Sequence, residues 1–562
     1  MTLPPTDPAA LPVIPINADR ALAQSHQGRA PKGLPLLLFL LSLAMHVPFL
    51  GITPIAGTEG HRIFPAHEMV RSGWWMVPML YDKPFLTKPP LHMWLIAISE
   101  RIAGHGGVLV WRLPSAIAGA LLCSAACWFG GRWFGKTAGL ISGFCALGMI
   151  TLWGQSQVAD IDSTNTLTSA LAAMCGIEMF FASQRLRLAW ILAAGLAIGA
   201  TLMTKGPAGL SIIAGVWVWG AIVAMRERGA GRIAHPSFWL PWLIGGAIFA
   251  AYLFDARASL RDHGLTLAAS LNGTSEGTSR LYPDSLPRLF TAVFVTPVLL
   301  LLYGLPITIS LASSFNSQVL DAMESGRRRI AIALAASVLI ALAVCIVTGT
   351  DNPRYEYVVL PPLCPLAGAV CVAAFAAGGN AAMWMRWIVA GSVVALAIAA
   401  VGLAAAAWPL PHAKVVLAAS AILALGVAAW TIANLPTTWR AAWGLAVLVL
   451  ITAIPFGLQR HYDRSNTSGI HAGETLRQIA GKNAAVAVGG AVTSKPEVFY
   501  YAGARVNYFP ANFTPQNVRP GTWVYLEEGE RKRWLQQPGV RLERVTVIPR
   551  TPKVNDYLAW YP

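Results

Sequence analysis

Long apolar runs separated by short polar joints fill the first 458 residues of the chain. About 20 apolar residues suffice for a helix to cross the hydrocarbon core of a bilayer. Of all residues 55% are hydrophobic and 12% charged, whereas a soluble domain carries about 25% charged residues. The pattern predicts a mainly α, polytopic membrane protein with about thirteen transmembrane helices. The predicted spans lie near 34–52, 110–130, 137–154, 163–182, 188–204, 208–225, 237–254, 289–312, 330–348, 358–377, 384–406, 413–433 and 441–458.

Three polar regions flank or interrupt these spans. Residues 1–33 are rich in Pro and Ala and lack the apolar core of a signal peptide, so we expect a disordered cytoplasmic leader. Residues 53–109 are too polar to cross the membrane but carry apolar residues at helical spacing, so we expect interfacial helices in this first outer loop. Residues 459–562, with 14 basic and 8 acidic side chains, form a separate polar domain, which leaves 34–458 as the transmembrane domain.

The polar domain has the pattern of a small α/β unit. It contains no Gly-rich phosphate loop and no nucleophile elbow. We expect it to serve as a structural or acceptor-docking lid. The predicted strands are Ala484–Val488, Trp523–Leu526 and Arg541–Ile548, and the predicted helices are Lys495–Tyr501 and Gly529–Gln536.

The distribution of basic residues predicts the membrane topology. The chain has 42 Lys and Arg against 26 Asp and Glu, but this excess sits beside apolar spans and not on an aromatic-interleaved surface, which argues against nucleic acid as a partner. Cytoplasmic joints are enriched in Lys and Arg, and a cytoplasmic N-terminus makes every even-numbered joint basic. Thirteen crossings then place the C-terminal domain on the extracytoplasmic side of the membrane. All seven cysteines lie in apolar stretches, without disulfide or zinc spacing.

The first outer loop holds an acid among several cations. Glu59, His61 and Arg62 follow the first span directly, and Lys88 opens a second amphipathic stretch. A carboxylate beside cations at the membrane surface can act as a general base while the cations hold the phosphate of a lipid-linked substrate. The alternative is an ordinary interfacial helix whose Lys and Arg contact lipid headgroups.

Three further polar points lie on the same predicted side. Asp160 and Asp162 precede the fourth span, where Asp162 could cap the helix or orient an acceptor. Lys205 stands at a Gly-Pro turn, and it could contact substrate or simply extend to the membrane surface. Arg354 and Tyr355 adjoin a Pro-interrupted span of the kind that lines a cavity.

The order of these segments resembles the GT-C glycosyltransferases that use polyprenyl-phosphate sugars, within the protein O-mannosyltransferase superfamily, and among them the aminoarabinose transferases of lipid A modification. The resemblance covers roughly residues 34–380. It is carried by Lys88-Pro89-Pro90-Leu91-His92-Met93-Trp94, Arg112-Leu113-Pro114-Ser115, Asp162, Thr204-Lys205-Gly206-Pro207 and Pro353-Arg354-Tyr355.

This resemblance implies an inverting membrane glycosyltransferase that moves a sugar from undecaprenyl phosphate to lipid A or to a protein or glycan hydroxyl. The family has Asp-Glu in the first loop, with the Asp taken as catalytic, where this chain has Thr58-Glu59. We expect Glu59 to take over as base with Asp162 assisting. The expected substrate-binding residues are His61, Arg62, Lys88, Arg112, Asp160, Lys205, Arg354 and Tyr355.

No cofactor is certain from the sequence. A divalent metal is compatible with the family, but the acidic position that neighbours the lysine is Thr87 here. The expected partners are a polyprenyl-phosphate sugar and a lipid, glycan or protein acceptor, and the expected state is a monomer. Two rivals are a catalytically inactive scaffold and a transporter of lipid-linked substrate, and a third is a glycan ligase or polymerase of the same class. A transporter would need ionisable residues near the bilayer midplane and two related halves.

Overall fold

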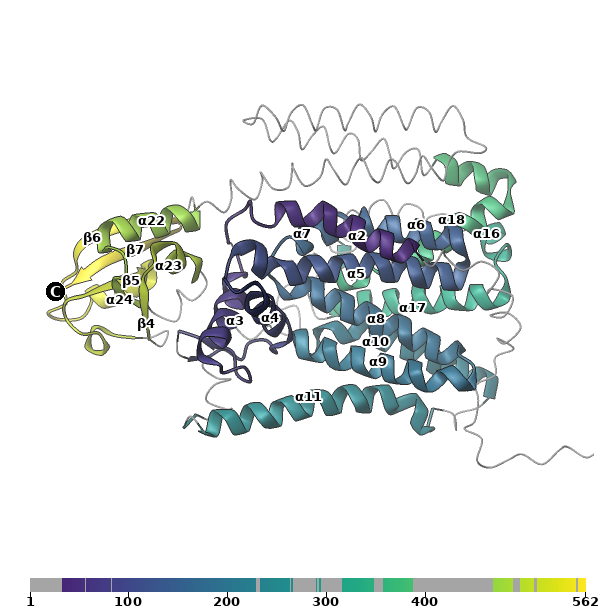
Figure 1. Cartoon of the computed structure of the whole chain (residues 1–562), viewed down its shortest axis with the longest axis horizontal. Helices are drawn as coiled ribbons and strands as arrows, with labels where there is room; N and C mark the ends of the chain where they lie inside the picture. The colour runs from purple at the N-terminus through teal and green to yellow at the C-terminus, as the bar shows by residue number, and fades with distance from the viewer. Residues whose placement is uncertain are drawn as a thin grey trace, which may run out of the picture.

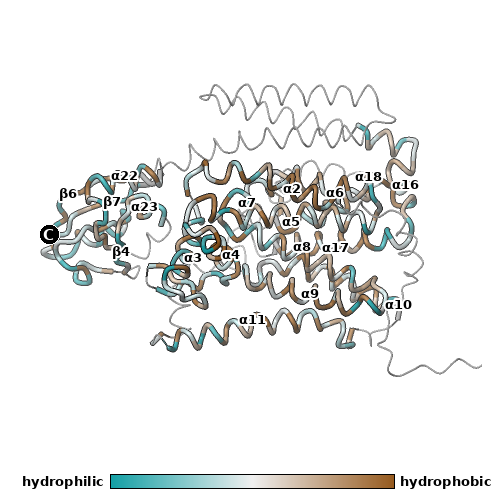
Figure 2. The backbone as a smooth tube through the Cα atoms, viewed as in Figure 1, coloured by the Kyte–Doolittle hydropathy of each residue, from teal (hydrophilic) through white to brown (hydrophobic). Residues whose placement is uncertain are grey.

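The computed structural model describes residues 33–55, 57–81, 83–228, 233–262, 264–265, 290, 293–294, 316–347, 357–387, 468–488, 496–509, 513–551 and 554–562. Long helices form a bundle, short helices cover one end of it, and a small sheet lies beyond them (Figure 1). Hydrophobic positions run along the bundle helices, whereas hydrophilic and hydrophobic positions mix in the C-terminal unit (Figure 2). The mainly helical class predicted from the apolar runs is confirmed.

Helices occupy nine of the predicted spans. A helix satisfies its own backbone N–H and C=O groups, which is why apolar runs adopt it in lipid. Three of these helices, over Val108–Phe134, Arg185–Lys205 and Pro236–Asp262, are long and apolar enough to cross a membrane by themselves among the described residues. The helices are α2 (Leu34–His46), α5 (Val108–Phe134), α6 (Lys136–Leu147) with α7 (Ile150–Ser156), α8 (Ile161–Phe181), α9 (Gln184–Lys205), α10 (Leu210–Arg228), α11 (Pro236–Asp262), α17 (Ser325–Val347) and α18 (Leu363–Ala377).

The remaining predicted spans lie mostly outside the described residues. These are 289–312, 384–406, 413–433 and 441–458. The count of thirteen crossings therefore stays a prediction.

Helix α5 runs through the centre of the bundle, where it packs on α2, α6 and α8. Glycines let these backbones approach closely, because a methyl group added at Gly139 of α6 would lie 2.6 Å from the Cα of Gly131 of α5. Around this contact, buried side chains such as Leu122 and Trp133 form the main apolar core.

The first outer loop forms the helices α3 (Gly60–Ser72) and α4 (Leu91–Ala103), as the sequence predicts, with a short hairpin of β1 (Met79–Leu80) and β2 (Lys83–Pro84) between them. Helix α3 buries Ile63, Ala66 and Met69, which are spaced three residues apart and so share one face. That face packs against Met93 and Ile96 of α4. The two helices cover the end of the bundle at which α8 begins (Figure 1).

The C-terminal unit is a five-stranded mixed sheet with helices, in the strand order β4-β3-β5-β7-β6. Strands β4, β3 and β5 are parallel, and β5, β7 and β6 are antiparallel. All five predicted elements are present, with ends that agree within three residues, but α22, β4 and β7 were not predicted. The elements are α22 (Ser468–Ala480), β3 (Ala485–Val488), α23 (Pro496–Ala502), β4 (Arg505–Tyr508), β5 (Thr522–Glu527), α24 (Glu528–Leu535), β6 (Glu543–Thr551) and β7 (Val554–Tyr561).

Candidate functional site

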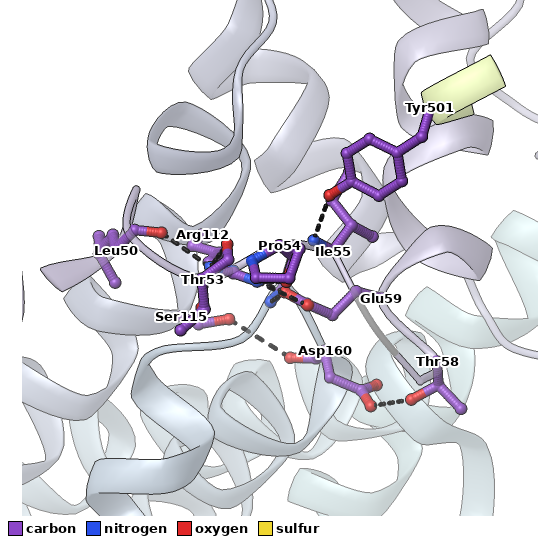
Figure 3. A network of polar contacts seen from close by, with 11 residues as sticks. Leu50, Thr53, Pro54, Ile55, Thr58, Glu59, Arg112, Ser115, Asp160 and Tyr501 are labelled. Atoms are coloured by element: carbon purple, nitrogen blue, oxygen red, sulfur yellow. Dashed lines mark hydrogen bonds and ion pairs between the residues drawn. The ribbon is translucent and has the colours of Figure 1, made fainter. Parts of the chain in front are cut away.

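Glu59 and Arg112 form a buried ion pair where the first loop meets α5. The guanidinium donates to both carboxylate oxygens, from Nε to Oε1 at 2.7 Å and from Nη2 to Oε2 at 2.8 Å, and the amide of Ala159 donates to Oε1 at 2.7 Å (Figure 3). Glu59 is 1% exposed and Arg112 0%. The other Arg112 donors bind Leu50 O, Thr53 O, Thr53 Oγ1 and Pro54 O.

These contacts use all five N–H groups of Arg112. The guanidinium therefore has no donor left for a substrate, and we assign it to the framework of the site, against the substrate-binding role that the sequence suggests. Glu59 could reach a substrate only by leaving a fully buried cation, which is costly.

Asp160 caps helix α8 and lies beside two groups of the first loop. Its Oδ1 accepts a hydrogen bond from the amide of Ile161 at 2.7 Å and lies 3.7 Å from Nε of Arg62, while its Oδ2 accepts from the hydroxyl of Thr58. The capping role suggested for Asp162 thus belongs to Asp160, because the helix begins one residue after it. Thr58, which stands where the family has an acid, donates to the Asp160 carboxylate. Sequence reasoning missed this contact, because a neutral threonine side chain does not indicate a role in the site.

Arg62 is a buried cation with donors to spare. It is 3% exposed, and its Nε and Nη1 have no hydrogen-bond partner among the residues that the structure describes. The guanidinium lies 5.9 Å from the centre of the Phe85 ring, on which the imidazole of His61 stacks at 5.6 Å. A desolvated guanidinium with unpaired N–H groups suits an anion that enters from outside the chain.

Asp162 and Lys205 form a second buried pair. The ammonium nitrogen of Lys205 lies 2.5 Å from Oδ1 of Asp162, and the two residues are 8% and 5% exposed. Lys205 ends α9 at a turn in which Gly206 has φ +64°, a conformation that favours glycine. The reading of Lys205 as a chain extended toward the membrane surface is therefore wrong, because its charge is buried against α8.

The Lys88 segment reaches the same place through α4. Lys88 is half-buried just before that helix, and His92 in its first turn is fully buried with Nδ1 2.9 Å from the hydroxyl of Thr164 on α8. Burial lowers the pKa of His92 to about 4, against the opposing effect of the Asp160 charge, so the imidazole is neutral at physiological pH. Its Nε2 has no hydrogen-bond partner in the described part of the chain.

The structure thus gathers segments that lie far apart in the sequence. Contacts among side chains connect the Glu59–Arg62 region with Asp160, Asp162 with Lys205, and the Lys88 segment with α8. Arg354 and Tyr355 lie outside the described residues, so their predicted roles stay predictions.

No group of three or more His, Cys, Asp or Glu side chains that could hold a metal ion occurs among the residues with described positions. Thr87 supplies a hydroxyl where an acidic ligand would be needed. The described residues around Lys88 therefore do not fit a divalent-metal site.

Two ionisable residues of the described apolar helices, Glu178 and His46, have local contacts. Glu178 accepts hydrogen bonds from Arg132 Nε at 2.5 Å and from Trp133 Nε1 at 2.8 Å, and His46 Nδ1 lies 2.6 Å from the carbonyl oxygen of Ser42 in its own helix. These contacts are consistent with a structural role for both residues, and they do not support a transporter mechanism.

Comparisons with known proteins show what the sequence and the fold of this chain resemble. The sequence profile of the family described as dolichyl-phosphate-mannose-protein mannosyltransferase matches residues 87–254. A crystal structure of ArnT from Cupriavidus metallidurans bound to undecaprenyl phosphate superposes with a TM-score of 0.69 at 17% identity, covering 94% of this chain and 98% of that one. This chain therefore shares the fold of that ArnT structure.

Sequence relatives point to the same group. An undecaprenyl phosphate-α-4-amino-4-deoxy-L-arabinose arabinosyl transferase from Pseudomonas savastanoi is 26% identical over 218 residues, which are 38% of this chain and 40% of that protein. The transferase of the same name from Pectobacterium carotovorum is 29% identical over 30% of this chain and 31% of its own length. The chain therefore matches well under half the length of these relatives. The resemblance predicted from the motif order is confirmed.

Proposed function

We propose that the chain is a membrane glycosyltransferase that moves a sugar from an undecaprenyl-phosphate carrier to an acceptor at the outer face of the bacterial inner membrane. The ArnT structure of the same fold binds undecaprenyl phosphate, and the sequence relatives are named for aminoarabinose transfer from that carrier. Lipid A is accordingly the first acceptor to test, followed by protein and glycan hydroxyls.

The observation that carries this proposal is Arg62. The Arg62 guanidinium is 3% exposed and lies 3.7 Å from Asp160, but two of its donor atoms lack a hydrogen-bond partner in the described structure, which is costly unless a ligand supplies the acceptors. A carrier phosphate would do so, and Lys88 follows Phe85, the residue whose ring faces Arg62, by three positions. The two cations would stabilise the charge that develops on the leaving phosphate.

Transfer requires one bond to form and one to break. The acceptor oxygen attacks the anomeric carbon, the bond from that carbon to the carrier phosphate oxygen breaks, and the phosphate leaves on the lipid. Attack on the face opposite the phosphate inverts the anomeric centre, as the family resemblance implies. When the acceptor is a hydroxyl, its proton goes to a carboxylate.

We assign that proton to Asp160, in place of the Glu59 suggested by the sequence. Both oxygens of Glu59 are held by the buried Arg112 guanidinium. The oxygens of Asp160 accept from the neutral Ile161 amide and Thr58 hydroxyl, and the carboxylate lies beside Arg62 and so next to the proposed phosphate position. Asp162, paired with Lys205, would orient the acceptor from the first turn of α8.

The membrane arrangement belongs to the same proposal. A cytoplasmic leader, about thirteen crossings and a periplasmic C-terminal domain from 459 onward would place α3, α4 and the sheet outside. The contact of α23 in the C-terminal unit with α3 supports a position of both parts on the same side of the membrane. Arg354 and Tyr355 would complete the carrier site in a monomeric enzyme.

The test compares two arginines of one helix. The full chain in nanodiscs is supplied with undecaprenyl-phosphate aminoarabinose and lipid A, and product is measured by mass spectrometry. Arg62→Ala should lower kcat/KM roughly 100-fold or more, the scale seen when one charge-stabilising donor is removed. Arg71→Ala, which removes an exposed pair with Glu68, should stay within about 2-fold.

Folded wild-type protein that consumes no polyprenyl-phosphate sugar with any of the three acceptor classes would establish the inactive scaffold instead. Equal activity of the two arginine variants would remove the phosphate-binding role from Arg62.

A further inference from the structure

Helix α23 of the C-terminal unit lies directly against the first outer loop (Figure 1). A methyl group added at Gly60, the first residue of α3, would lie 2.5 Å from Cγ of Pro496, the first residue of α23. The Tyr500 ring packs on Phe64 and Trp111, with ring centres 5.6 and 5.8 Å apart. The C-terminal unit therefore contacts the segment that carries the candidate site.

One hydrogen bond joins the C-terminal unit to the turn of the first outer loop that contains Ile55. The amide of Ile55 donates to the hydroxyl oxygen of Tyr501 at 2.7 Å, across 446 residues of sequence (Figure 3). Ile55 is 0% exposed, and a buried amide without an acceptor costs about 1–3 kcal/mol. Tyr501 supplies the acceptor that this turn of the loop cannot find in a helix or strand.

The same loop is held on its other side by Arg112. The guanidinium binds the carbonyl oxygens of Thr53 and Pro54, which precede Ile55, and the carboxylate of Glu59, which follows it. Tyr501 thus lies opposite Arg112 across a short stretch of backbone. Thr58, the residue that donates to Asp160, belongs to this stretch.

We propose that Tyr501 is a positioning residue for sugar transfer, which makes the C-terminal unit a working part of the enzyme. Its hydroxyl holds the 53–59 loop against Arg112, and the loop sets Thr58 and Arg62 relative to Asp160. This inference rests on the proposed function. It requires no contact between Tyr501 and substrate.

The expected effect is on rate more than on binding. Loss of the hydroxyl leaves the loop held by Arg112, by the Ala159 amide on Glu59 and by the contact of Thr58 with Asp160. A shift of about 1 Å in a catalytic group can cost up to about 100-fold in rate. Because the loop keeps these other contacts, we expect kcat of Tyr501→Phe to fall about 10-fold. The KM for the carrier should change less than 3-fold, because the cations that would hold the phosphate remain.

The matched control is Tyr500→Phe. It removes the same atom from the neighbouring residue of α23, whose hydroxyl makes no hydrogen bond within the described residues, and it keeps the ring contacts with Phe64 and Trp111. Transfer kinetics are measured on the full chain in nanodiscs, and hydrogen exchange is followed for peptides spanning 53–59.

A fall in kcat for Tyr501→Phe with faster exchange in 53–59, and neither change in Tyr500→Phe, supports the proposal. Unchanged kcat overturns it, whether or not exchange changes. A lower kcat with unchanged exchange also overturns it, because Tyr501 would then not act through the loop. If the wild-type chain transfers no sugar, the proposed function fails, and the exchange comparison still decides whether Tyr501 holds the loop.

Discussion

Replacing Glu59 by Gln separates a framework role from a catalytic one. Gln has the same shape, but its amide nitrogen faces a guanidinium donor, and Arg112 then stays 0% exposed without a counter-charge. Removing one partner of a buried ion pair costs about 3–5 kcal/mol. Arg112 keeps its bonds to Leu50, Thr53 and Pro54, so we expect the low end of this range, a loss of about 3 kcal/mol in the free energy of unfolding.

The assay is denaturant unfolding of the full chain in detergent micelles, followed by tryptophan fluorescence. Glu68→Gln is the control, because Glu68 pairs with exposed Arg71 on the same helix and should cost under about 1 kcal/mol. The double variant Glu59→Leu with Arg112→Met should lose less stability than Glu59→Gln alone, since no unpaired charge remains buried.

The refuting result is specific. If Glu59→Gln unfolds at the wild-type denaturant concentration and yet loses transfer by about 1000-fold, Glu59 acts as the base and the framework assignment fails. Loss of stability together with substantial transfer by the folded fraction would agree with the reasoning from the Arg112 contacts.

Three further predictions concern the remaining carboxylates. Asp160→Asn should lower kcat for a hydroxyl acceptor by about 100-fold, and Thr58→Val by less, with circular dichroism to show intact helices; equal kcat for Asp160→Asn and wild type would contradict the assignment. Asp162→Asn and Lys205→Met should each lower the unfolding midpoint more than the double variant does, and additive losses would show that the 2.5 Å pair is not coupled. Burial raises the pKa of Glu530 from 4.5 to about 7, so the folded state binds more protons between these values and stability should fall by about 3 kcal/mol as pH rises from 4.5 to 7. Glu530→Gln should flatten that pH dependence of unfolding, and an unchanged slope would assign it to other groups.

The sequence determined the elements and the group of proteins that this chain resembles. Apolar runs must become helices in lipid, because the helix satisfies its own backbone groups. Short apolar runs were enough to find β3 and β5 of the C-terminal unit, and alternation of apolar and polar residues was enough to find β6. Elements with weaker patterns, such as β4 (Arg505–Tyr508), were missed, because they depend on pairing with a neighbouring strand.

Motif order also singled out residues that the structure brings close together. Glu59, Arg62, Asp160 and Asp162 were all expected near one another, and the structure joins Arg62 with Asp160 and places Glu59 against the amide of Ala159, the residue before Asp160.

Only the tertiary structure decided which charge pairs with which. The sequence offers several acids and several cations at one expected membrane depth, and each combination is compatible with its spacing. The contact of the first outer loop with α5 pairs Glu59 with Arg112, and the packing of α8 on α9 pairs Asp162 with Lys205. Arg62 keeps two donor atoms without a hydrogen-bond partner among the described residues. The contact of Tyr501 with Ile55 could not be predicted from the sequence either. A hydrogen bond across 446 residues depends on where two folded units meet, and the local sequence pattern does not indicate it.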